Sequence, residues 1–436
     1  MAMGAIFVCW LASRLVERRD RGFVVSIVVV SFALRAFWSV FQHIINPAVW
    51  PIFAADAILR YNWSKNRAEA WEQGLYAPSL PMGLGDAHAE LIMLKTIALF
   101  RVFGVSPMLP EAVTITVNVT VIIAIYLICR QIGAVRNAAR AAAVFGAFLP
   151  SLMFWSTQNV KDPVTAAGVT WAALAVISIS QRARSGDFAL LSGATFLTVV
   201  YRPYVGFMLI MGQLLGGLMT VKLPRTALGS VSRISMLVVM VPLILYAGLR
   251  EMEQTYGGVD LHWAIEQYTE FHEAASQRPG ARGSEYEIPL TADTPTQAIM
   301  QLPIRILLLL LTPIPLFPGG LTKLMMYPEM WFIYLFLVPR FGTGVCEAWR
   351  KNRPALILLL MVIAPMISGY ALKTSVSGEA FRMRVQFLPV LLVFAGVGHA
   401  VRQQRKLERK QRRAEKMRYR RQPEKVSASV RDQAGT

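Results

Sequence analysis

Three separate segments of the sequence place cationic side chains beside the ends of long apolar runs. Lys161 and Asp162 stand side by side in STQNVKDP, Arg202 interrupts the apolar run VVYRPYVGF, and Arg382 and Arg384 precede the last apolar run. A side chain that snorkels to the membrane surface would explain any one of these cations. Arginine binds phosphate through paired hydrogen bonds and lysine binds it as a point charge, so the three segments together predict a phosphate site.

Acidic candidates follow the second apolar run of the chain. Asp56 precedes Arg60 by four residues, and on a helix the two would share a face and could form an ion pair. Alternatively, Asp56 acts as a general base, or it holds an acceptor hydroxyl or a metal ion. The second group, Asp86, His88 and Glu90, has alternate spacing that shares one face of a strand but not of a helix. These residues either assist Asp56 or lie in a solvated loop, and as metal ligands they are a weak pattern.

The residues of STQNVKDP also have a structural interpretation. Aspartate followed by proline is typical of a helix start, with the aspartate as N-cap and the proline in the first turn, so we predict that role for Asp162. Lys161 then needs a partner, which is either Asp162 or an anionic ligand. Tyr201 and Tyr204 flank Arg202 as aromatic residues typical of a membrane interface.

The composition identifies the surroundings of these residues as a membrane. The chain has 436 residues, of which 55% are hydrophobic and 16% charged, and its mean hydropathy is +0.44. Soluble domains carry about 25% charged residues. Apolar runs such as 24–41, 113–129 and 355–372 approach the roughly 20 residues that cross a bilayer core. The sequence therefore predicts an all-α, polytopic helical membrane protein.

Clusters of lysine and arginine in short loops set the predicted orientation in a bacterial inner membrane, because such loops stay in the cytoplasm. This rule places the N-terminus outside and the C-terminus in the cytoplasm. It predicts about eleven transmembrane helices, at residues 2–13, 23–46, 111–131, 138–156, 163–181, 187–201, 204–221, 234–249, 324–339, 355–372 and 385–401.

The predicted path leaves two large loops, 47–110 and 250–323, on the outer face. The apolar segments 91–104 and 302–320 within them are interpreted as interfacial helices, since the first carries charges and the second is broken by prolines. This outer face is the predicted active face of a transmembrane domain that covers residues 1–401.

The net charge of +19 has a membrane explanation. Residues 402–436 form a basic cytoplasmic tail without fixed structure, and such a tail beside the last span favours contact with anionic lipid rather than nucleic acid. We therefore expect the lipid bilayer, and no nucleic acid, as a partner. The three cysteines have no metal-type spacing, so neither a disulfide framework nor a zinc site is expected.

Residues 24–220 carry short motifs in an order that resembles the GT-C superfamily, the polytopic glycosyltransferases that use polyprenyl-phosphate sugars outside the cytoplasm. The similarity is to the PMT-like type of this superfamily. The motifs are Asp56 with Tyr61 and Ala68, LFRVFGVSP at 99–107, Asn118 in a span that ends in YLICRQIG, and FLPSLMFWSTQNVKDP at 148–163.

The resemblance implies that Asp56, in the first outer loop, is the catalytic residue, and that cations at outer helix ends hold the carrier phosphate. It also implies transfer of a sugar to a glycan, lipid or protein acceptor, with a divalent cation as an open question and no metal ligand assigned. Two departures weaken the match, because residues 56–57 are not a pair of acids and no large soluble domain follows the last span. The predicted substrate-binding residues are Arg60, Tyr61, Asp86, His88, Lys161, Arg202, Tyr204, Arg382 and Arg384.

The C-terminal half supports a second interpretation. TPIPLFPGG at 312–320 and SGEAFRMRVQFLP at 377–389 resemble bacterial envelope-polysaccharide membrane proteins, including polymerases. A polysaccharide polymerase or a ligase of the O-antigen kind would use outer-loop arginines instead of a catalytic aspartate. A lipid-linked sugar transporter or a non-enzymatic assembly protein is the third alternative, and it would need no outer charged residue for turnover.

Overall fold

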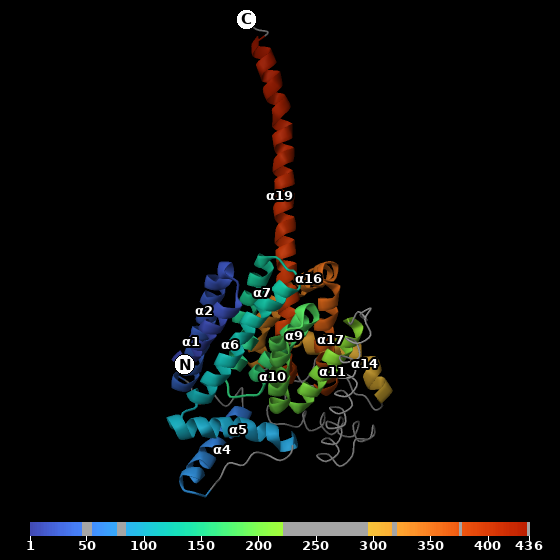
Figure 1. The fold of residues 1–436 in the computed structure, drawn as a ribbon. Helices are drawn as coiled ribbons and strands as arrows, with labels where there is room; N and C mark the ends of the chain where they lie inside the picture. The colour runs from blue at the N-terminus through green and yellow to red at the C-terminus, as the bar shows by residue number, and fades with distance from the viewer. Residues whose placement is uncertain (46–54, 76–83, 221–294, 316–320, 375–376, 434–436) are drawn as a thin grey trace.

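The computed structural model describes residues 1–45, 55–75, 84–220, 295–315, 321–374 and 377–433, and within these ranges the chain is all-α. Figure 1 shows a helical bundle with one long helix, α19 (Leu388–Gln433), that projects from one end. At the opposite end lie α4 (Ala55–Glu72) and α5 (Leu84–Phe103), with α5 across the bundle. We call these the tail end and the α5 end.

Four helices are long and apolar enough to cross a membrane, namely α2 (Arg18–Ile45), α6 (Met108–Gln131), α9 (Asp162–Arg182) and α17 (Arg353–Lys373). Two bent pairs pass the same test when each pair is taken as one span. They are α7 (Arg136–Phe148) with α8 (Pro150–Ser156), and α18 (Ser377–Arg384) with α19. The described residues therefore contain four to six helical segments that could span a membrane.

The predicted count of about eleven spans is not confirmed. The segments predicted at 2–13, 187–201 and 204–221 form shorter apolar helices, and the predicted span at 234–249 lies outside the described residues. Hydropathy counts apolar runs, whereas a 17-residue helix rises only about 25 Å, short of a bilayer core of about 30 Å. The shorter elements are α1 (Ala2–Leu15), α10 (Ser185–Tyr201), α11 (Pro203–Thr220), α14 (Pro295–Leu311), α15 (Leu321–Phe332), η1 (Ile333–Leu337) and α16 (Val338–Lys351).

Small residues let the helices of the bundle approach closely. A Cβ at Gly344 of α16 would overlap the carbonyl of Phe394 in α19, and a Cβ at Gly398 of α19 would overlap the carbonyl of Arg340 in α16. On α7, the alanine-rich sequence places buried alanines against α19, where Gly396 faces Ala142. Such close backbone contacts replace the hydrophobic effect as the packing force inside a membrane.

The α5 end has a small core of its own. Ala68 of α4 packs with Met93, Ile97 and Phe100 of α5. This core joins the two helices of the first predicted outer loop into a unit that contacts the turn before α9 through Arg60 and Lys95. At the tail end, α19 continues in helical form to Gln433, with exposed side chains from Arg402 to Lys416.

Candidate functional site

The site is carried by the turn between α8 and α9, and a break in the preceding span positions that turn. α7 and α8 meet at an angle of 51° beside Pro150, which has no N–H to continue the helix. The guanidinium of Arg35 in α2 is buried at this break. Its Nη1 donates to the carbonyl of Ala147 at 3.0 Å, and its Nε donates to Ser156 Oγ at 2.9 Å. Arg35 thus satisfies a carbonyl exposed by the break and fixes the end of α8.

A carboxylate supports the other side of the same break. The backbone N–H of Ser151, in the first turn of α8, donates to Oε2 of Glu329 at 2.5 Å. Glu329 comes from α15 and is buried. Charged side chains from two distant helices therefore hold the broken span in one conformation, as the cost of unpaired backbone groups in a membrane requires.

The turn itself is buried and leads directly into α9. Residues 157–160 are all buried, and α9 begins at Asp162 with Pro163 in its first turn. Asn118 of α6 donates from Nδ2 to the Pro163 carbonyl at 3.3 Å, which ties the start of α9 to the neighbouring span. The predicted N-cap role of Asp162 is wrong. The N-cap is Lys161, and no side chain caps this helix start.

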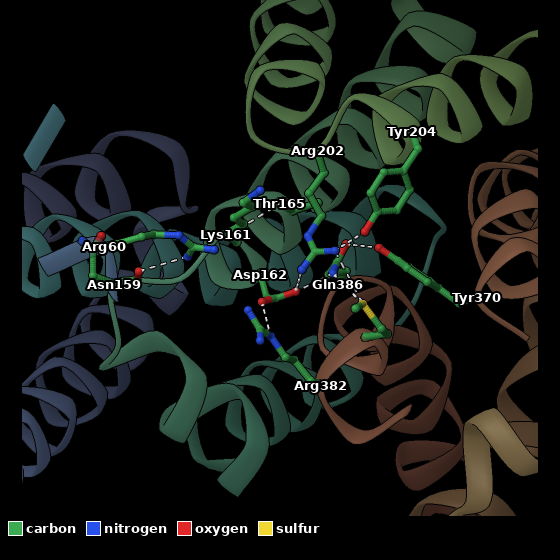
Figure 2. A network of polar contacts seen from close by, with 11 residues as sticks. Arg60, Asn159, Lys161, Asp162, Thr165, Arg202, Tyr204, Tyr370, Arg382 and Gln386 are labelled. Carbon is green, nitrogen blue, oxygen red and sulfur yellow. Dashed lines mark hydrogen bonds and ion pairs between the residues drawn. The ribbon is translucent and has the colours of Figure 1, made fainter. Parts of the chain in front are cut away.

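Asp162 instead occupies the centre of a buried ionic network (Figure 2). Arg202 donates from Nη2 to Oδ1 at 2.5 Å, and Arg382 donates from Nε to Oδ2 at 2.7 Å. Gln386 adds a third hydrogen bond, from Nε2 to Oδ1 at 2.7 Å. Asp162 is fully buried, and a buried carboxylate is stable only when it is paired and hydrogen-bonded in this way.

Two tyrosines extend the network on one side. Tyr204 accepts a hydrogen bond from Nη1 of Arg202, and the guanidinium also lies over its ring, 5.7 Å from the centroid. Tyr370 donates to Oε1 of Gln386 at 2.6 Å. The Lys373 ammonium lies 5.0 Å from the centroid of the Tyr204 ring. The predicted interface aromatic Tyr204 is therefore part of the site.

Further cations approach from α4 and α5 on the other side. Arg60 donates from Nη1 to the Asn159 carbonyl at 3.4 Å. Lys95 donates from Nζ to Asn159 Oδ1 at 3.1 Å. Asn159 in turn donates from Nδ2 to Thr96 Oγ1 at 3.2 Å. Burial, with repulsion from Arg60 as a smaller cause, lowers the pKa of Lys95 to about 8. The helices of the first predicted outer loop thus contribute directly to this site.

Two of the predicted substrate-binding residues, Tyr61 and Arg384, take part in helix packing and helix capping. The Tyr61 ring packs edge-on against Phe100, with centroids 5.7 Å apart, in the small core of the α5 end. Arg384 is buried and donates from Nη1 to the carbonyls of Leu310 and Thr312, at 2.8 and 2.9 Å. Arg384 therefore caps the C-terminal end of α14, where unpaired carbonyls need donors.

The predicted acidic residues lie at the starts of the two helices at the α5 end. Asp56 belongs to the first turn of α4, and Asp86 and His88 belong to the first turns of α5. The side chains of all three lie outside the described residues. Among the side chains that the structure does describe, no group of three or more His, Cys, Asp or Glu residues could hold a metal ion.

The arrangement favours binding of an anion. Five cations lie around the start of α9, where two of them bond Asp162 directly and two bond Asn159 in the preceding turn. The N-terminus of a helix adds a partial positive charge and unpaired N–H groups, which commonly bind phosphate. The cations are Arg60, Lys95, Lys161, Arg202 and Arg382.

Several residues of the network could not be predicted from the sequence. Gln386, Tyr370 and Asn159 are neutral polar residues in or beside apolar runs, and a run of this kind offers no signal for which of them are paired. A buried pair at the start of α6 was not predicted either. There, His43 Nε2 lies 3.0 Å from both carboxylate oxygens of Glu111.

Lys95 could have been identified as a site residue from the sequence, because a lysine within an apolar helix needs a partner or a ligand.

Comparison of the chain with protein-family models and with curated protein sequences finds no match in either case.

Proposed function

We propose that this protein is a membrane glycosyltransferase that moves a sugar from a polyprenyl-phosphate carrier to an acceptor in envelope glycan synthesis. The observation that supports this proposal most strongly is the convergence of cations from five parts of the chain on the N-terminus of a helix long enough to span a membrane. A carrier with a lipid tail presents its phosphate at the end of such a helix, where one charge can meet several donors at once.

In the proposed reaction, Asp56 takes the proton of an acceptor hydroxyl as its oxygen attacks the anomeric carbon of the sugar. The bond between that carbon and the carrier phosphate oxygen breaks, and the electron pair leaves with the phosphate. Arg382, Lys161 and Lys95 stabilise the charge that develops on the departing phosphate, as preorganised cations do. Arg202 has a positioning role, because it is buried beneath this surface and holds Asp162.

The test compares lipid extracts from cells that carry the wild-type protein or Arg382→Gln. Arg382 is 21% exposed, and its loss leaves Asp162 paired with Arg202, so the protein should fold. We expect polyprenyl-phosphate sugar to accumulate and transfer to fall by about 100-fold, equivalent to about 2.7 kcal/mol. Unchanged transfer by Arg382→Gln, at a normal protein level, would refute the proposal.

A matched control exists at the tail end of the bundle. There the buried Asp20 pairs with Arg136 at 3.0 Å and with Arg140 at 2.5 Å. Arg136→Gln therefore also removes one arginine from a carboxylate that keeps another. We expect this variant to retain transfer, since it lies at the opposite end of α6 from the proposed site.

The participation of Arg382 also favours a second candidate, a polysaccharide polymerase or ligase. Such an enzyme would join glycans from polyprenyl-diphosphate carriers and would depend on arginines alone. The two candidates differ in their dependence on Asp56. Loss of transfer in Asp56→Asn supports the glycosyltransferase, whereas full activity of Asp56→Asn together with an inactive Arg382→Gln supports the polymerase.

A further inference from the structure

A groove of about 690 Å³ opens on the side of the bundle, away from the network around Asp162. α6 and α9 pack together to form its floor, with α1 beside α6 and α10 beside α9 as its walls. The walls are apolar, with Phe7 and Leu11 on one and Leu190 and Leu197 on the other. Its volume falls within the range of about 300–1,000 Å³ typical of small-molecule sites.

One wall of the groove contains a glycine, which has no side chain to fill the space. Gly193 of α10 lines the groove, and a Cβ at this position would meet no atom within 4 Å. The lining residues of α9 run from Ala167 to Arg182, so the groove extends toward the tail end. It therefore lies along the membrane-embedded part of the bundle and reaches the end of the helices where the basic segments gather.

The tail end of the groove is polar. Arg182 lines it and forms no ion pair with any residue that the structure describes, and the exposed Arg184 follows. Asp187 also lines this end and accepts a hydrogen bond from the backbone N–H of Arg184 at 3.2 Å. Gln131 donates to Ser178 Oγ at 2.6 Å, while its buried Oε1 meets no donor among the described residues.

We infer that this groove binds one acyl chain of a phosphatidylglycerol molecule from the leaflet at the tail end. The apolar walls match an acyl chain, and the length of the groove follows the helices as a chain in that leaflet does. Arg182 and the adjacent exposed Arg184 match the anionic phosphate. The headgroup hydroxyls supply the donor that the Oε1 of Gln131 lacks, which a choline headgroup cannot do.

Trp171 provides a direct readout of this binding. It lines the floor of the groove and donates from Nε1 to Thr120 Oγ1 at 2.8 Å. The full-length protein in detergent is titrated with phosphatidylglycerol that carries dibrominated acyl chains, since bromine quenches tryptophan fluorescence on contact. The same titration of Trp171→Phe is subtracted, which isolates the quenching of Trp171 from that of the other tryptophans. Saturable quenching of Trp171 is the expected result.

Two variants separate the groove from general lipid contact. A Cβ at Gly193 meets no atom, and leucine has a higher helix propensity than glycine. We therefore expect Gly193→Leu to fold and to bind at least about tenfold more weakly, or by about 1.4 kcal/mol, because its side chain occupies the groove. Gly342→Leu on α16 is the matched control, since a Cβ there also meets no atom within 4 Å. Arg182→Gln should weaken binding of phosphatidylglycerol and leave brominated phosphatidylcholine unchanged.

Several results would overturn the inference. Equal quenching by phosphatidylglycerol and phosphatidylcholine would mean unselective lipid contact, and wild-type binding by Gly193→Leu would place the lipid elsewhere. Stronger competition by undecaprenyl phosphate than by phosphatidylglycerol would assign the groove to the carrier lipid instead. A disulfide between two copies of a Gly193→Cys variant would assign it to a second copy of the chain.

Discussion

Asp162→Asn keeps the shape of the side chain and removes one negative charge from the buried network. The carboxylate now accepts hydrogen bonds from Arg202, Arg382 and Gln386 at 2.5 to 2.7 Å. An asparagine oxygen can still accept from Arg202 and Gln386, but its Nδ2 would face Nε of Arg382, so two donors would meet. Loss of one partner of a buried ion pair costs about 3–5 kcal/mol. We expect about 3 kcal/mol, because Arg382 is 21% exposed and can turn toward solvent.

The same substitution should strengthen the binding of an anion. A phosphate on the far side of either guanidinium would lie about 7 Å from the carboxylate, where like charges repel by about 2 kcal/mol at an effective dielectric constant of about 20. Removing that repulsion raises the affinity by about 30-fold. Asp162→Asn is therefore expected to be less stable than the wild type when empty and to bind a phosphate ligand more tightly.

Thermal unfolding in detergent, with and without farnesyl phosphate, measures both effects. A ligand that binds only the folded protein stabilises it by an amount that grows with its concentration divided by its Kd. The melting temperature of Asp162→Asn should start below that of the wild type and rise further on addition of farnesyl phosphate. A smaller ligand-induced rise in Asp162→Asn than in the wild type would refute the assignment of this network to an anion site.

Asp20→Asn controls for a general effect of charge removal. Asp20 is also fully buried, with Arg136, Arg140 and the Tyr126 hydroxyl as its partners. Its substitution should lower the melting temperature by less than Asp162→Asn does, because both of its arginines are more exposed. It should leave the rise caused by farnesyl phosphate unchanged, because this second network lies at the tail end. An increase in that rise would mean that farnesyl phosphate binds elsewhere on the protein.

Three further predictions concern the site and the packing that supports it. The pKa of Lys95 lies at about 8, and a bound anion raises this pKa because it stabilises the ammonium form. The affinity for farnesyl phosphate should therefore fall by about tenfold between about pH 7.5 and about pH 9.5. Calorimetry measures this change, and Lys95→Met should show no such pH dependence. Arg202→Lys should lower both the melting temperature and the rate of transfer. The guanidinium of Arg202 bonds Asp162 and the Tyr204 hydroxyl at the same time, and one ammonium cannot reproduce this geometry. Gly344→Ala should separate α16 from α19 and destabilise the protein by about 1–3 kcal/mol in thermal unfolding, whereas Gly342→Ala should not.

The cations of the site were predictable because charged residues in or beside apolar runs stand out. Lys161, Arg202 and Arg382 were selected on that basis, and the structure brings Arg202 and Arg382 together on one carboxylate. The carboxylate itself was misassigned. Asp-Pro is a strong local pattern for a helix cap, and a partner 220 residues further along the chain leaves no trace in the local sequence.

Helical geometry explains why the basic segment was only partly assigned. Arg382 and Arg384 are two residues apart on α18, and residues at that spacing point to different sides of a helix. One therefore contacts Asp162 and the other caps α14. The choice between them requires the position of α18 in the bundle, which hydropathy does not provide. The predicted number of spans is not confirmed for a related reason, since hydropathy does not show where a helix bends or ends.

The two aspartate networks of this protein show which feature points to a ligand. Each has one fully buried aspartate with two arginines, so this arrangement alone only balances charge. At Asp20 the arginines are 37% and 34% exposed, and water can solvate their remaining charge. At Asp162, Arg202 is only 7% exposed, and further cations surround the same turn. Guanidinium and ammonium groups gathered around one buried helix start can donate together to a single phosphate, and this clustering is the feature that supports a ligand.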